Sequence, residues 1–475
     1  MLLFFVFFSN CISFMPVNSI DINYKFENES DFIWGINGHP VVDKEYVESS
    51  LEQQLSFLTE HQFSIYRFDV NLNDEGLLFD NKVERFDSLL EMANKKNIQV
   101  FPVLKFYGSF LKQDTLTEQE IYQKAKRQGK NFAKKDSSRI RYYAIENELD
   151  LKTIAPNARG TSSKDYSVGN PEMVIASLKG MIDGIKGVSP EAQTIINYGG
   201  WYNWSFIDFL LENDVDFDIL GCHWYSENGR RLFQLENHNI NVLNELKRFN
   251  KPIWITEINK GNGSKYHTES EQAEMMNLFI DDLYKYPHVK AFFVYELYDM
   301  PYLRTQEWTN YEASDYGIIG WKSDPPVYSE YYYKPVSNVL KFRIEQAKNG
   351  IENYVISLYK DLIQQTPTDA LVNHWVNEFK DQPNVETWIE MFLEHEKPTW
   401  TFFAKKNNSE EEKEEYIQSV YTRLLKRNPT IKEMKFWKKY IKNKDSLDVY
   451  KILLSSEEYW NQSIWDGYKR KQANN

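Results

Sequence analysis

Short β-rich runs alternate with longer amphipathic stretches from Ile20 to about Ala347, and this alternation constrains the fold more than any other feature of the sequence. It is typical of parallel strands that are connected by helices. The predicted strands are Phe32–Ile36, Ser64–Val70, Gln99–Phe106, Ile140–Ile145, Thr194–Tyr198, Asp218–Trp224, Ile253–Thr256 and Ala291–Tyr295. The predicted helices are Tyr46–Glu60, Arg85–Lys95, Glu118–Gln128, Glu172–Lys186, Ser205–Leu211, Arg231–Phe249, Ser270–Tyr286 and Ser337–Ala347.

Eight strands that are each followed by a helix, over about 330 residues, fit a (β/α)8 TIM barrel. A doubly wound open sheet would show the same alternation. However, no predicted strand is followed by a Gly-x-Gly-x-x-Gly turn, and the Gly-rich string at Gly261–Lys265 has neither the spacing nor the order of a phosphate-binding loop. The sequence therefore predicts an α/β barrel domain over residues 20–347.

The region after Ala347 is rich in Lys and Glu, has no strand-like runs, and places apolar residues at helical spacing. It predicts an all-α domain over residues 348–475 with two repeats, about 352–400 and 414–462. Tyr354, Tyr359, Leu362, Pro367 and Trp375 recur 62 residues later as Tyr416, Tyr421, Leu424, Pro429 and Trp437. We expect these residues to form the core of each repeat, with Ser409–Glu415 as a linker or the start of a helix.

Charge and cysteine content exclude several classes of protein. The net charge of −13 gives no general electrostatic attraction to phosphate backbones, so nucleic acid is not an expected partner. Two cysteines cannot build a disulfide framework or a thiolate metal site, and the eight histidines show no metal-binding spacing. We therefore predict neither a cofactor nor a metal. Aromatic residues make up 16% of the chain, a density that suits a carbohydrate-binding surface as well as a ring-rich core.

The first residues, from Met1 to Val17, are mostly apolar and are followed by the small residue Ser19. This pattern predicts a secretory signal peptide over residues 1–19, which is too short to span a bilayer as a mature helix. Cys11 in Phe8-Ser9-Asn10-Cys11 leaves lipid anchoring open as an alternative. Both interpretations predict a secreted or cell-surface protein.

Acidic residues follow two of the predicted strands. The fourth strand leads into Glu146-Asn147-Glu148, and the seventh ends in Thr256-Glu257. A carboxylate at the end of an apolar strand needs a partner or a function, and barrel enzymes carry their catalytic residues at these strand ends. Because strands four and seven lie on opposite sides of the barrel, Glu148 and Glu257 are expected to face each other. Such a pair suits glycoside cleavage, in which one acid protonates the leaving oxygen and one carboxylate attacks the anomeric carbon.

Two other carboxylates compete for these roles. Glu146 lies beside the predicted pair, so which acid acts on the leaving group stays open. Glu296 follows the eighth strand, and we interpret it as a structural residue or a contact to a sugar hydroxyl.

From about Trp34 to Lys334 the sequence resembles the large clan of retaining (β/α)8 glycoside hydrolases, including its xylosidase-like and polysaccharide-endoglycosidase branches. The resemblance implies that Asn147-Glu148 supplies the acid/base and Glu257 the nucleophile. It also implies that Arg67 keeps the nucleophile ionised, and that His223 and Tyr225 support the site. The second C-terminal repeat, at Tyr421–Pro429, resembles a helical module of unknown function from bacterial surface and secreted proteins.

Aromatic residues near strand ends are candidates for stacking on sugar rings. We predict substrate contacts from Tyr107, Trp201 and Trp224, in addition to Asn147, Arg67, His223, Tyr225 and Glu296. Trp34, Trp204, Tyr298 and Trp308 are further candidates, of which most are expected to pack in the core.

We therefore expect an enzyme that hydrolyses a β-linked polysaccharide or oligosaccharide with retention of configuration. A non-catalytic carbohydrate-binding or scaffold protein on the same barrel is an alternative of a different class, and a transglycosylase is an alternative with the same chemistry. The C-terminal helical domain is expected to bind a cell-surface polymer or a protein.

Overall fold

The computed structural model describes residues 32–106, 116–136, 138–226, 232–235, 240–305, 311–380, 382, 384–396, 409–441 and 446–474. The predicted signal peptide and Cys11 lie outside these residues. The chain divides into two compact units, Phe26–Ile344 and Glu345–Asn475.

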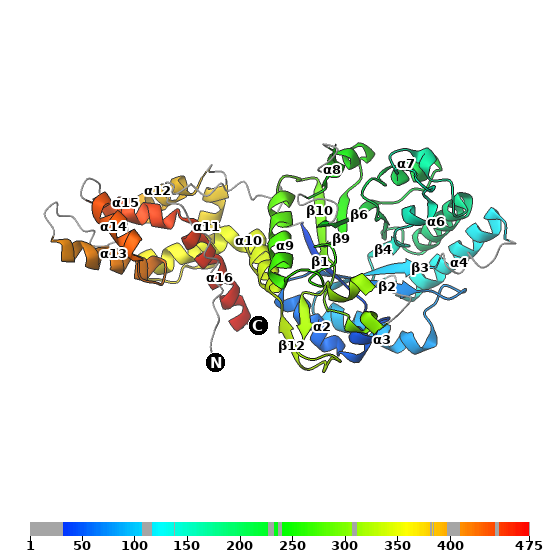
Figure 1. Ribbon diagram of the computed structural model, residues 1–475, viewed down its shortest axis with the longest axis horizontal. Helices are drawn as coiled ribbons and strands as arrows, with labels where there is room; N and C mark the ends of the chain where they lie inside the picture. Colours follow the sequence, from blue (N-terminus) through cyan, green and yellow to red (C-terminus); the bar gives the residue numbers. More distant parts are fainter. Residues whose placement is uncertain are drawn as a thin grey trace. The chain divides into compact units, whose positions relative to one another are not determined.

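In the described part of the first unit, eight parallel strands close into a barrel (Figure 1). Each strand pairs with its neighbours in sequence, and the last pairs with the first. The strands are β1 (Ile33–Gly38), β2 (Ile65–Asn71), β3 (Gln99–Lys105), β4 (Tyr142–Ile145), β5 (Gln193–Tyr198), β6 (Ile219–Tyr225), β9 (Ile253–Asn259) and β10 (Val289–Val294). The predicted (β/α)8 fold is confirmed.

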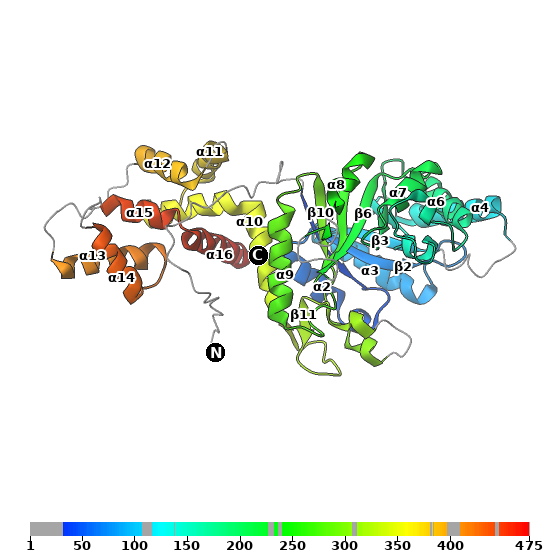
Figure 2. The same cartoon turned by 45° about the horizontal axis from the view of Figure 1, so that its top comes forward.

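Helices cover the outside of the barrel (Figures 1 and 2). They are α2 (Leu51–Glu60), α3 (Asp80–Lys95), α4 (Glu118–Asp136), α6 (Pro171–Lys186), α7 (Ser205–Glu212), α8 (Val242–Leu246), α9 (Glu269–Leu283) and the first part of α10 (Pro335–Leu358). Two short helices, α1 (Lys44–Glu48) and α5 (Asp150–Thr153), follow β1 and β4 along the chain. Two short antiparallel pairs interrupt the alternation, namely β7 (Gln234–Leu235) with β8 (Ile240–Asn241), and β11 (Ile319–Trp321) with β12 (Tyr331–Tyr333).

The barrel interior is filled with side chains below the level of the site. Ile65, Phe101, Val103, Tyr142, Ala144, Ile195, Ile219, Trp254, Ala291 and Phe293 form one buried cluster. Trp254 is its largest member, and its ring centroid lies 4.9 Å from that of Tyr142 and 5.7 Å from that of Phe293. Gly35 on β1 makes room for Phe293, because a Cβ at this position would lie 2.3 Å from the Phe293 ring. This floor closes the barrel, so a ligand reaches the strand ends from one side only.

One predicted helix is wrong in part. The sequence pattern predicts a helix over Arg231–Phe249, but the structure places the β7–β8 pair there and begins helix α8 at Val242. The side chain of Asn241 accepts a hydrogen bond from the backbone N–H of Asn244 at 3.1 Å. A residue that caps the N-terminus in this way fixes where a helix starts, whatever the apolar spacing before it.

The second unit is helical in its described residues. Helix α10 has a non-helical backbone at Asn349, and a π-helical turn, Tyr359–Ile363, follows its end. The further helices are α11 (Asp369–Lys380), α12 (Val385–Glu396), α13 (Glu410–Leu424), α14 (Ile431–Ile441), α15 (Ser446–Leu454) and α16 (Glu457–Asn474) (Figure 2). Among the described helices, none has both the length and the apolar character needed to cross a bilayer.

The two repeats make the same buried contact. The indole N–H of Trp375 donates to the hydroxyl of Tyr359 at 3.0 Å, and that of Trp437 donates to the hydroxyl of Tyr421 at 2.7 Å. All four side chains are buried. Ser409 caps helix α13, so the charged stretch after it is the start of a helix. The repeated aromatic residues therefore hold each copy together from within.

Candidate active site

A cleft of about 480 Å³ opens at the carboxyl ends of the barrel strands. It is lined by Asn37, Gly38, His39, Arg67, Phe68, Asp69, Lys105, Asn147, Glu148, Trp201, Tyr225, Glu257, Asn262, Tyr295, Ala313 and Tyr316. Six residues that the sequence singles out as catalytic or substrate-binding are among them, namely Arg67, Asn147, Glu148, Trp201, Tyr225 and Glu257. The strand ends thus bring these six residues together, although Arg67 and Glu257 lie 190 positions apart in the chain.

The turn after β4 gives Glu148 its position. Glu146 and Glu148 both have positive φ angles, 64° and 51°, which non-glycine residues seldom adopt. Asn197 on β5 holds this turn, since its Oδ1 accepts from the backbone N–H of Glu148 at 3.0 Å and its Nδ2 donates to the carbonyl of Glu146 at 3.2 Å. Gly199 leaves space for the Glu148 side chain, because a Cβ there would lie 2.2 Å from Oε1 of Glu148.

The same turn directs Glu146 elsewhere. Its Oε1 accepts a hydrogen bond from the backbone N–H of Phe106 at 2.5 Å, and the residue is only 4% exposed. Glu146 therefore links the ends of β3 and β4, whereas the side chain of Glu148 is 29% exposed and lines the cleft. This geometry favours Glu148 over Glu146 as the acid.

Glu257 lies within β9 and is almost enclosed. Its Oε1 accepts from Arg67 at 2.7 Å, and its Oε2 accepts from the hydroxyl of Tyr225 at 2.8 Å. The rings of Tyr225, Tyr295 and Tyr316 contact one another and form a wall beside it. Both carboxylate oxygens are therefore oriented by fixed donors.

These donors keep Glu257 anionic. Burial alone would raise the pKa of Glu257, but the charges of His223 and Arg67, with the hydrogen bonds from Arg67 and Tyr225, lower this pKa below its usual value. A carboxylate that stays ionised in an enclosed site is suited to act as a nucleophile.

Arg67 is itself held on three sides. One guanidinium nitrogen donates to Oδ1 of Asn37 at 2.6 Å as well as to Glu257, and the other donates to Oδ1 of Asn147 at 2.8 Å. Asn37 is fixed in turn by donating to the carbonyls of Thr256 and Val294. Arg67 thus orients Asn147, next to the candidate acid, and Glu257 at the same time.

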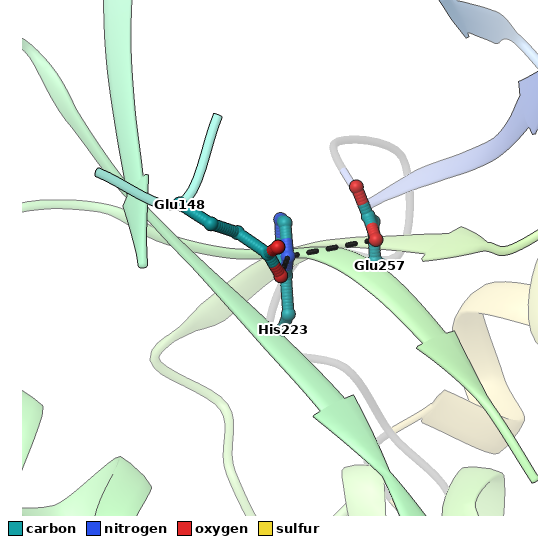
Figure 3. A group of neighbouring side chains, drawn as sticks. All are labelled: Glu148, His223 and Glu257. Carbon is teal, nitrogen blue, oxygen red and sulfur yellow. Dashed lines mark hydrogen bonds and ion pairs between the residues drawn. The ribbon is translucent and has the colours of Figure 1, made fainter. Parts of the chain in front are cut away.

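His223 lies between the two carboxylates (Figure 3). Its Nδ1 is 2.7 Å from Oε1 of Glu148 and 3.5 Å from Oε2 of Glu257, and its side chain is fully buried. β9 is the third strand round from β4, so the acids meet over β6 rather than across the full diameter of the barrel. His223 is therefore a positioning residue beneath the cleft, not a residue that a sugar reaches.

The atoms that Glu148, His223 and Glu257 offer as potential metal ligands lie within 4.8 Å of one another. The guanidinium of Arg67, however, is 2.7 Å from the Glu257 carboxylate. A fixed positive charge at this distance opposes the binding of a metal cation. We assign no metal to the site.

The predicted substrate contact of His223, which lies beneath the cleft, is wrong, and two further predicted contacts are wrong as well. Trp224 is fully buried and packs against Phe233, with ring centroids 4.6 Å apart. Side chains alternate along a strand, so Trp224 points to the opposite face from its neighbours His223 and Tyr225. The side chain of Glu296 is also fully buried, and its Oε2 accepts from the hydroxyl of Tyr46 at 2.8 Å. Tyr107, which is predicted to bind sugar, and Trp308, a further aromatic candidate, lie outside the described residues.

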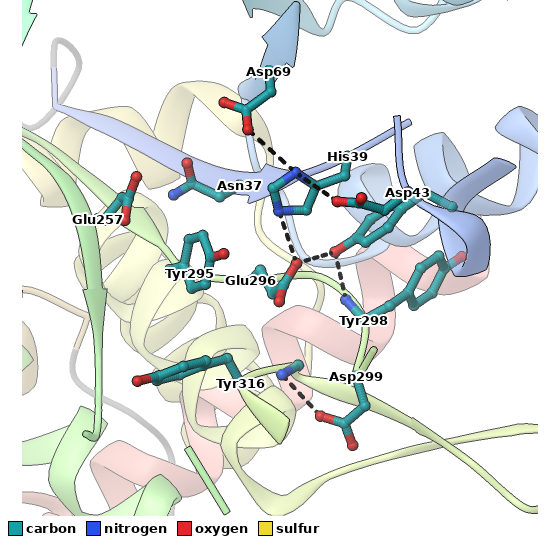
Figure 4. Close-up of polar contacts among 12 residues, drawn as sticks. Asn37, His39, Asp43, Asp69, Glu257, Tyr295, Glu296, Tyr298, Asp299 and Tyr316 are labelled. Atoms are coloured by element: carbon teal, nitrogen blue, oxygen red, sulfur yellow. Dashed lines mark hydrogen bonds and ion pairs between the residues drawn. The ribbon is translucent and has the colours of Figure 1, made fainter. Parts of the chain in front are cut away.

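Glu296 belongs to a polar cluster around His39 (Figure 4). His39 Nε2 lies 3.3 Å from Oε2 of Glu296, and its Nδ1 lies 3.2 Å from Asp43 and 3.7 Å from Asp69. Burial alone would lower the pKa of His39, but Glu296, Asp43 and Asp69 raise it to about 9. The imidazole is therefore a cation at neutral pH, and Glu296 is its structural partner.

Several cleft residues are not among the predicted site residues. Asp69 and Lys105 line the cleft from the ends of β2 and β3, and Tyr295 and Tyr316 line it from the other side. The signal for Asp69 and Lys105 is present in the sequence, because both are charged residues near the end of an apolar run. The predicted strands extend past both residues, so the pattern treats them as strand interior.

We expect replacement of Arg67 by Met to move the acidic limb of the kcat/KM–pH profile upward by about one to two units, because the pKa of Glu257 rises when the guanidinium is lost. The limb moves up because Glu257 must be deprotonated to act, and without Arg67 this requires a higher pH. Arg67→Lys keeps the charge and should leave the limb closer to that of the wild type. A limb that stays in place in Arg67→Met would contradict the assigned role.

Residues 162–315 match the family model described as "Glycosyl hydrolase catalytic core". The matched segment includes His223, Tyr225 and Glu257. No curated protein sequence matches the chain.

Solved structures with similar folds include GH5_18 from Streptomyces cattleya in complex with GlcNAc. It is 15% identical, with a TM-score of 0.51, over 67% of this chain and 80% of that one. A β-glucosidase from Thermotoga maritima in complex with deoxynojirimycin is 12% identical, with a TM-score of 0.48, over 68% of this chain and 99% of that one. The Streptomyces structure shows a shared barrel fold. The described barrel thus has the fold of (β/α)8 glycoside hydrolases, and residues 162–315 are similar to a glycosyl hydrolase catalytic core.

Proposed function

We propose that this protein cleaves a β-linked glycan with net retention of configuration, with Glu257 as the nucleophile and Glu148 as the acid/base. The observation that carries the proposal is the closeness of the two carboxylates, which contact the same Nδ1 of His223 and bring oxygens within 4.8 Å of each other. Carboxyl groups in retaining enzymes lie about 5–5.5 Å apart, whereas inverting enzymes leave about 6.5–9.5 Å for a water molecule.

In the first step of this mechanism, a carboxylate oxygen of Glu257 attacks the anomeric carbon while the bond to the leaving oxygen breaks. Glu148 donates its proton to that oxygen, and a glycosyl ester forms on Glu257. In the second step Glu148, now a carboxylate, takes a proton from water as the water oxygen attacks the anomeric carbon. The ester bond breaks, Glu257 regains its negative charge, and Glu148 regains its proton.

Four other residues of the site support these two steps. Arg67 and Tyr225 stabilise the Glu257 carboxylate both before attack and as it leaves. His223 keeps Glu148 directed at the space above Glu257 through its 2.7 Å contact. Trp201 is 40% exposed at the cleft, and we propose that its ring stacks on a sugar on the Glu148 side.

A panel of 2,4-dinitrophenyl β-glycosides and soluble β-glucans, xylans and mannans tests the proposed function. We expect turnover of at least one member, with the β-anomer as the first-formed product by proton NMR. Binding without turnover across the panel would favour the non-catalytic alternative. A first-formed α-anomer would contradict retention. Transfer to an added sugar acceptor that exceeds hydrolysis would favour the transglycosylase.

We further propose that the enzyme acts outside the cytoplasm, as the apolar N-terminal segment over residues 1–19 suggests. There, the helical unit would hold the barrel at a polymer or a cell-surface partner. The repeats carry no second pair of acids that matches Glu148 and Glu257, which is consistent with a role in placement rather than in catalysis.

A chain that ends at Lys348 should keep its fold and its kcat/KM on a small soluble glycoside. The part of α10 up to Arg343 is needed for the barrel, since Ser337 contacts His61, Lys341 contacts Glu60 and Arg343 donates to Asn277. On an insoluble polysaccharide the rate should fall about tenfold or more, because the loss affects local concentration and not chemistry. A large drop in Tm, with equal losses on both substrates, would show that the helical unit is structural.

A further inference from the structure

Asp69 and Lys105 lie at the cleft ends of β2 and β3, above the closed floor of the barrel. On β2, Ile65 lies in the buried cluster, Arg67 contacts Glu257, and Asp69 lines the cleft. On β3, Phe101 and Val103 lie in the cluster, and Lys105 lines the cleft. Since alternate residues of a strand share a face, Asp69 and Lys105 both point into the barrel mouth.

The two side chains form an ion pair that a ligand can reach. Lys105 Nζ lies 2.5 Å from Oδ2 of Asp69, and the side chains are 37% and 21% exposed. His39 lies 3.7 Å from Asp69 on one side and 3.3 Å from Glu296 on the other (Figure 4). Asp69 is therefore held from below while its upper side and the Lys105 ammonium face the cleft.

The pair lies on the nucleophile's side of the cleft. Burial alone would lower the pKa of Lys105, but Asp69 and, to a smaller degree, Glu257 raise it, which places its positive charge near Glu257. Trp201, in contrast, lies on the side of Glu148, because Gly199, two residues before it, packs closely against the Glu148 side chain. Because Glu148 protonates the leaving oxygen, the leaving group extends toward Glu148 and Trp201. The sugar that is attacked then extends toward Asp69 and Lys105.

The charges of the described lining residues favour a neutral sugar. Each cation already has a carboxylate partner, with Arg67 on Glu257, Lys105 on Asp69 and His39 on Glu296. A uronate carboxylate would have to compete with these partners and would meet the negative charges of Asp69 and Glu257. Hydroxyl groups fit better, since one hydroxyl donates to a carboxylate oxygen while its neighbour accepts from an ammonium group.

We propose that Asp69 and Lys105 together bind two adjacent hydroxyl groups of the sugar that Glu257 attacks, and that they restrict the enzyme to neutral glycans in which both hydroxyls are free. This inference rests on the proposed function. It assigns the pair a role in substrate specificity and no part in proton transfer.

The test combines protein variants with deoxy substrates. The preferred 2,4-dinitrophenyl β-glycoside is compared with analogues that lack single ring hydroxyls, in the wild type, Lys105→Met and Asp69→Asn. Each variant should lower kcat/KM on the parent sugar about 10–100-fold, the effect of losing a hydrogen bond to a charged group. On the analogue that lacks the partner hydroxyl, the same variant should lose less than about threefold, since the contact is already absent.

Lys124→Met is the matched control, because Lys124 forms a similar 3.0 Å ion pair with Asp74 away from the cleft. Equal losses on the parent sugar and on every deoxy analogue would show that Asp69 and Lys105 are structural and would overturn the inference. Faster cleavage of the β-glucuronide than of any neutral glycoside would overturn it as well. Asp69→Asn is isosteric and keeps the inference falsifiable if Lys105→Met fails to fold. If no panel member is turned over by the wild type, the proposed function itself fails.

Discussion

Replacement of Glu257 by Gln should lower kcat on every substrate by a factor on the order of 10⁵ or more, because an amide cannot form the glycosyl ester. The change is isosteric, and Arg67 and Tyr225 keep a neighbour of the same shape. The variant should therefore fold and bind glycans. Steady-state kinetics with an activated and an unactivated substrate measures the effect. The factor by which kcat falls should be comparable for the two substrates.

Removal of the whole side chain allows a sharper test. In Glu257→Ala, azide has room to take the place of the carboxylate and attack the anomeric carbon from the same face. The product should then be an α-glycosyl azide, with inverted configuration. A β-glycosyl azide, or a variant with more than about a hundredth of the wild-type rate without azide, would show that another residue is the nucleophile.

Replacement of Glu148 by Gln should have an effect that depends on the leaving group. On unactivated glycosides we expect kcat/KM to fall about 10²–10⁴-fold, because the leaving oxygen is no longer protonated. With 2,4-dinitrophenolate, which needs no proton, kcat/KM should stay near that of the wild type. The hydrolysis of the ester still lacks its base, so a burst of dinitrophenolate should precede a slow steady state.

Glu146→Gln is the matched control for this variant, since Glu146 is two residues away and bonds to the backbone of Phe106. It should keep the wild-type dependence on the leaving group. Azide added to Glu148→Ala should give a β-glycosyl azide, because it attacks the glycosyl ester from the face of the lost base. If Glu146→Gln instead shows the leaving-group dependence, the acid is misassigned by two positions.

The barrel is readable from the sequence because each of its strands is a local apolar run. All eight predicted strands coincide with β1–β6, β9 and β10 to within a few residues. The rule that catalytic groups follow barrel strands then leads to Glu148 and Glu257, which lie far apart in the chain. That rule requires only strand ends and chain order, and both are local properties.

Trp224 shows an error that the sequence itself could have prevented. His223 and Tyr225 are two residues apart and share one face of β6, so the residue between them faces the other way. Asp69 shows a related omission, since the same alternation from Ile65 through Arg67 leads directly to it. In both cases the two-residue alternation along a strand predicts which side chains face the cleft, whereas aromatic or acidic character alone does not.

Other features depend on contacts between distant segments. Glu296 is structural because Tyr46 and His39, about 250 residues earlier, enclose it. Glu146 and Glu148 are told apart by Asn197 and by the backbone of Phe106. No local pattern predicts these partners, because each pairing arises only when the barrel closes.

Identification of the residue that becomes glycosylated tests the central claim most directly. The enzyme is incubated with the 2,4-dinitrophenyl 2-deoxy-2-fluoro-β-glycoside of its preferred sugar. The fluorine slows both formation and breakdown of the ester, and the good leaving group restores the rate of formation only, so the ester accumulates. Peptide mass spectrometry should then find one sugar on the peptide that contains Glu257, and no labelling in Glu257→Gln. A sugar attached to any other residue, or full turnover with an inverted product and no labelled peptide, would contradict retaining hydrolysis through Glu257.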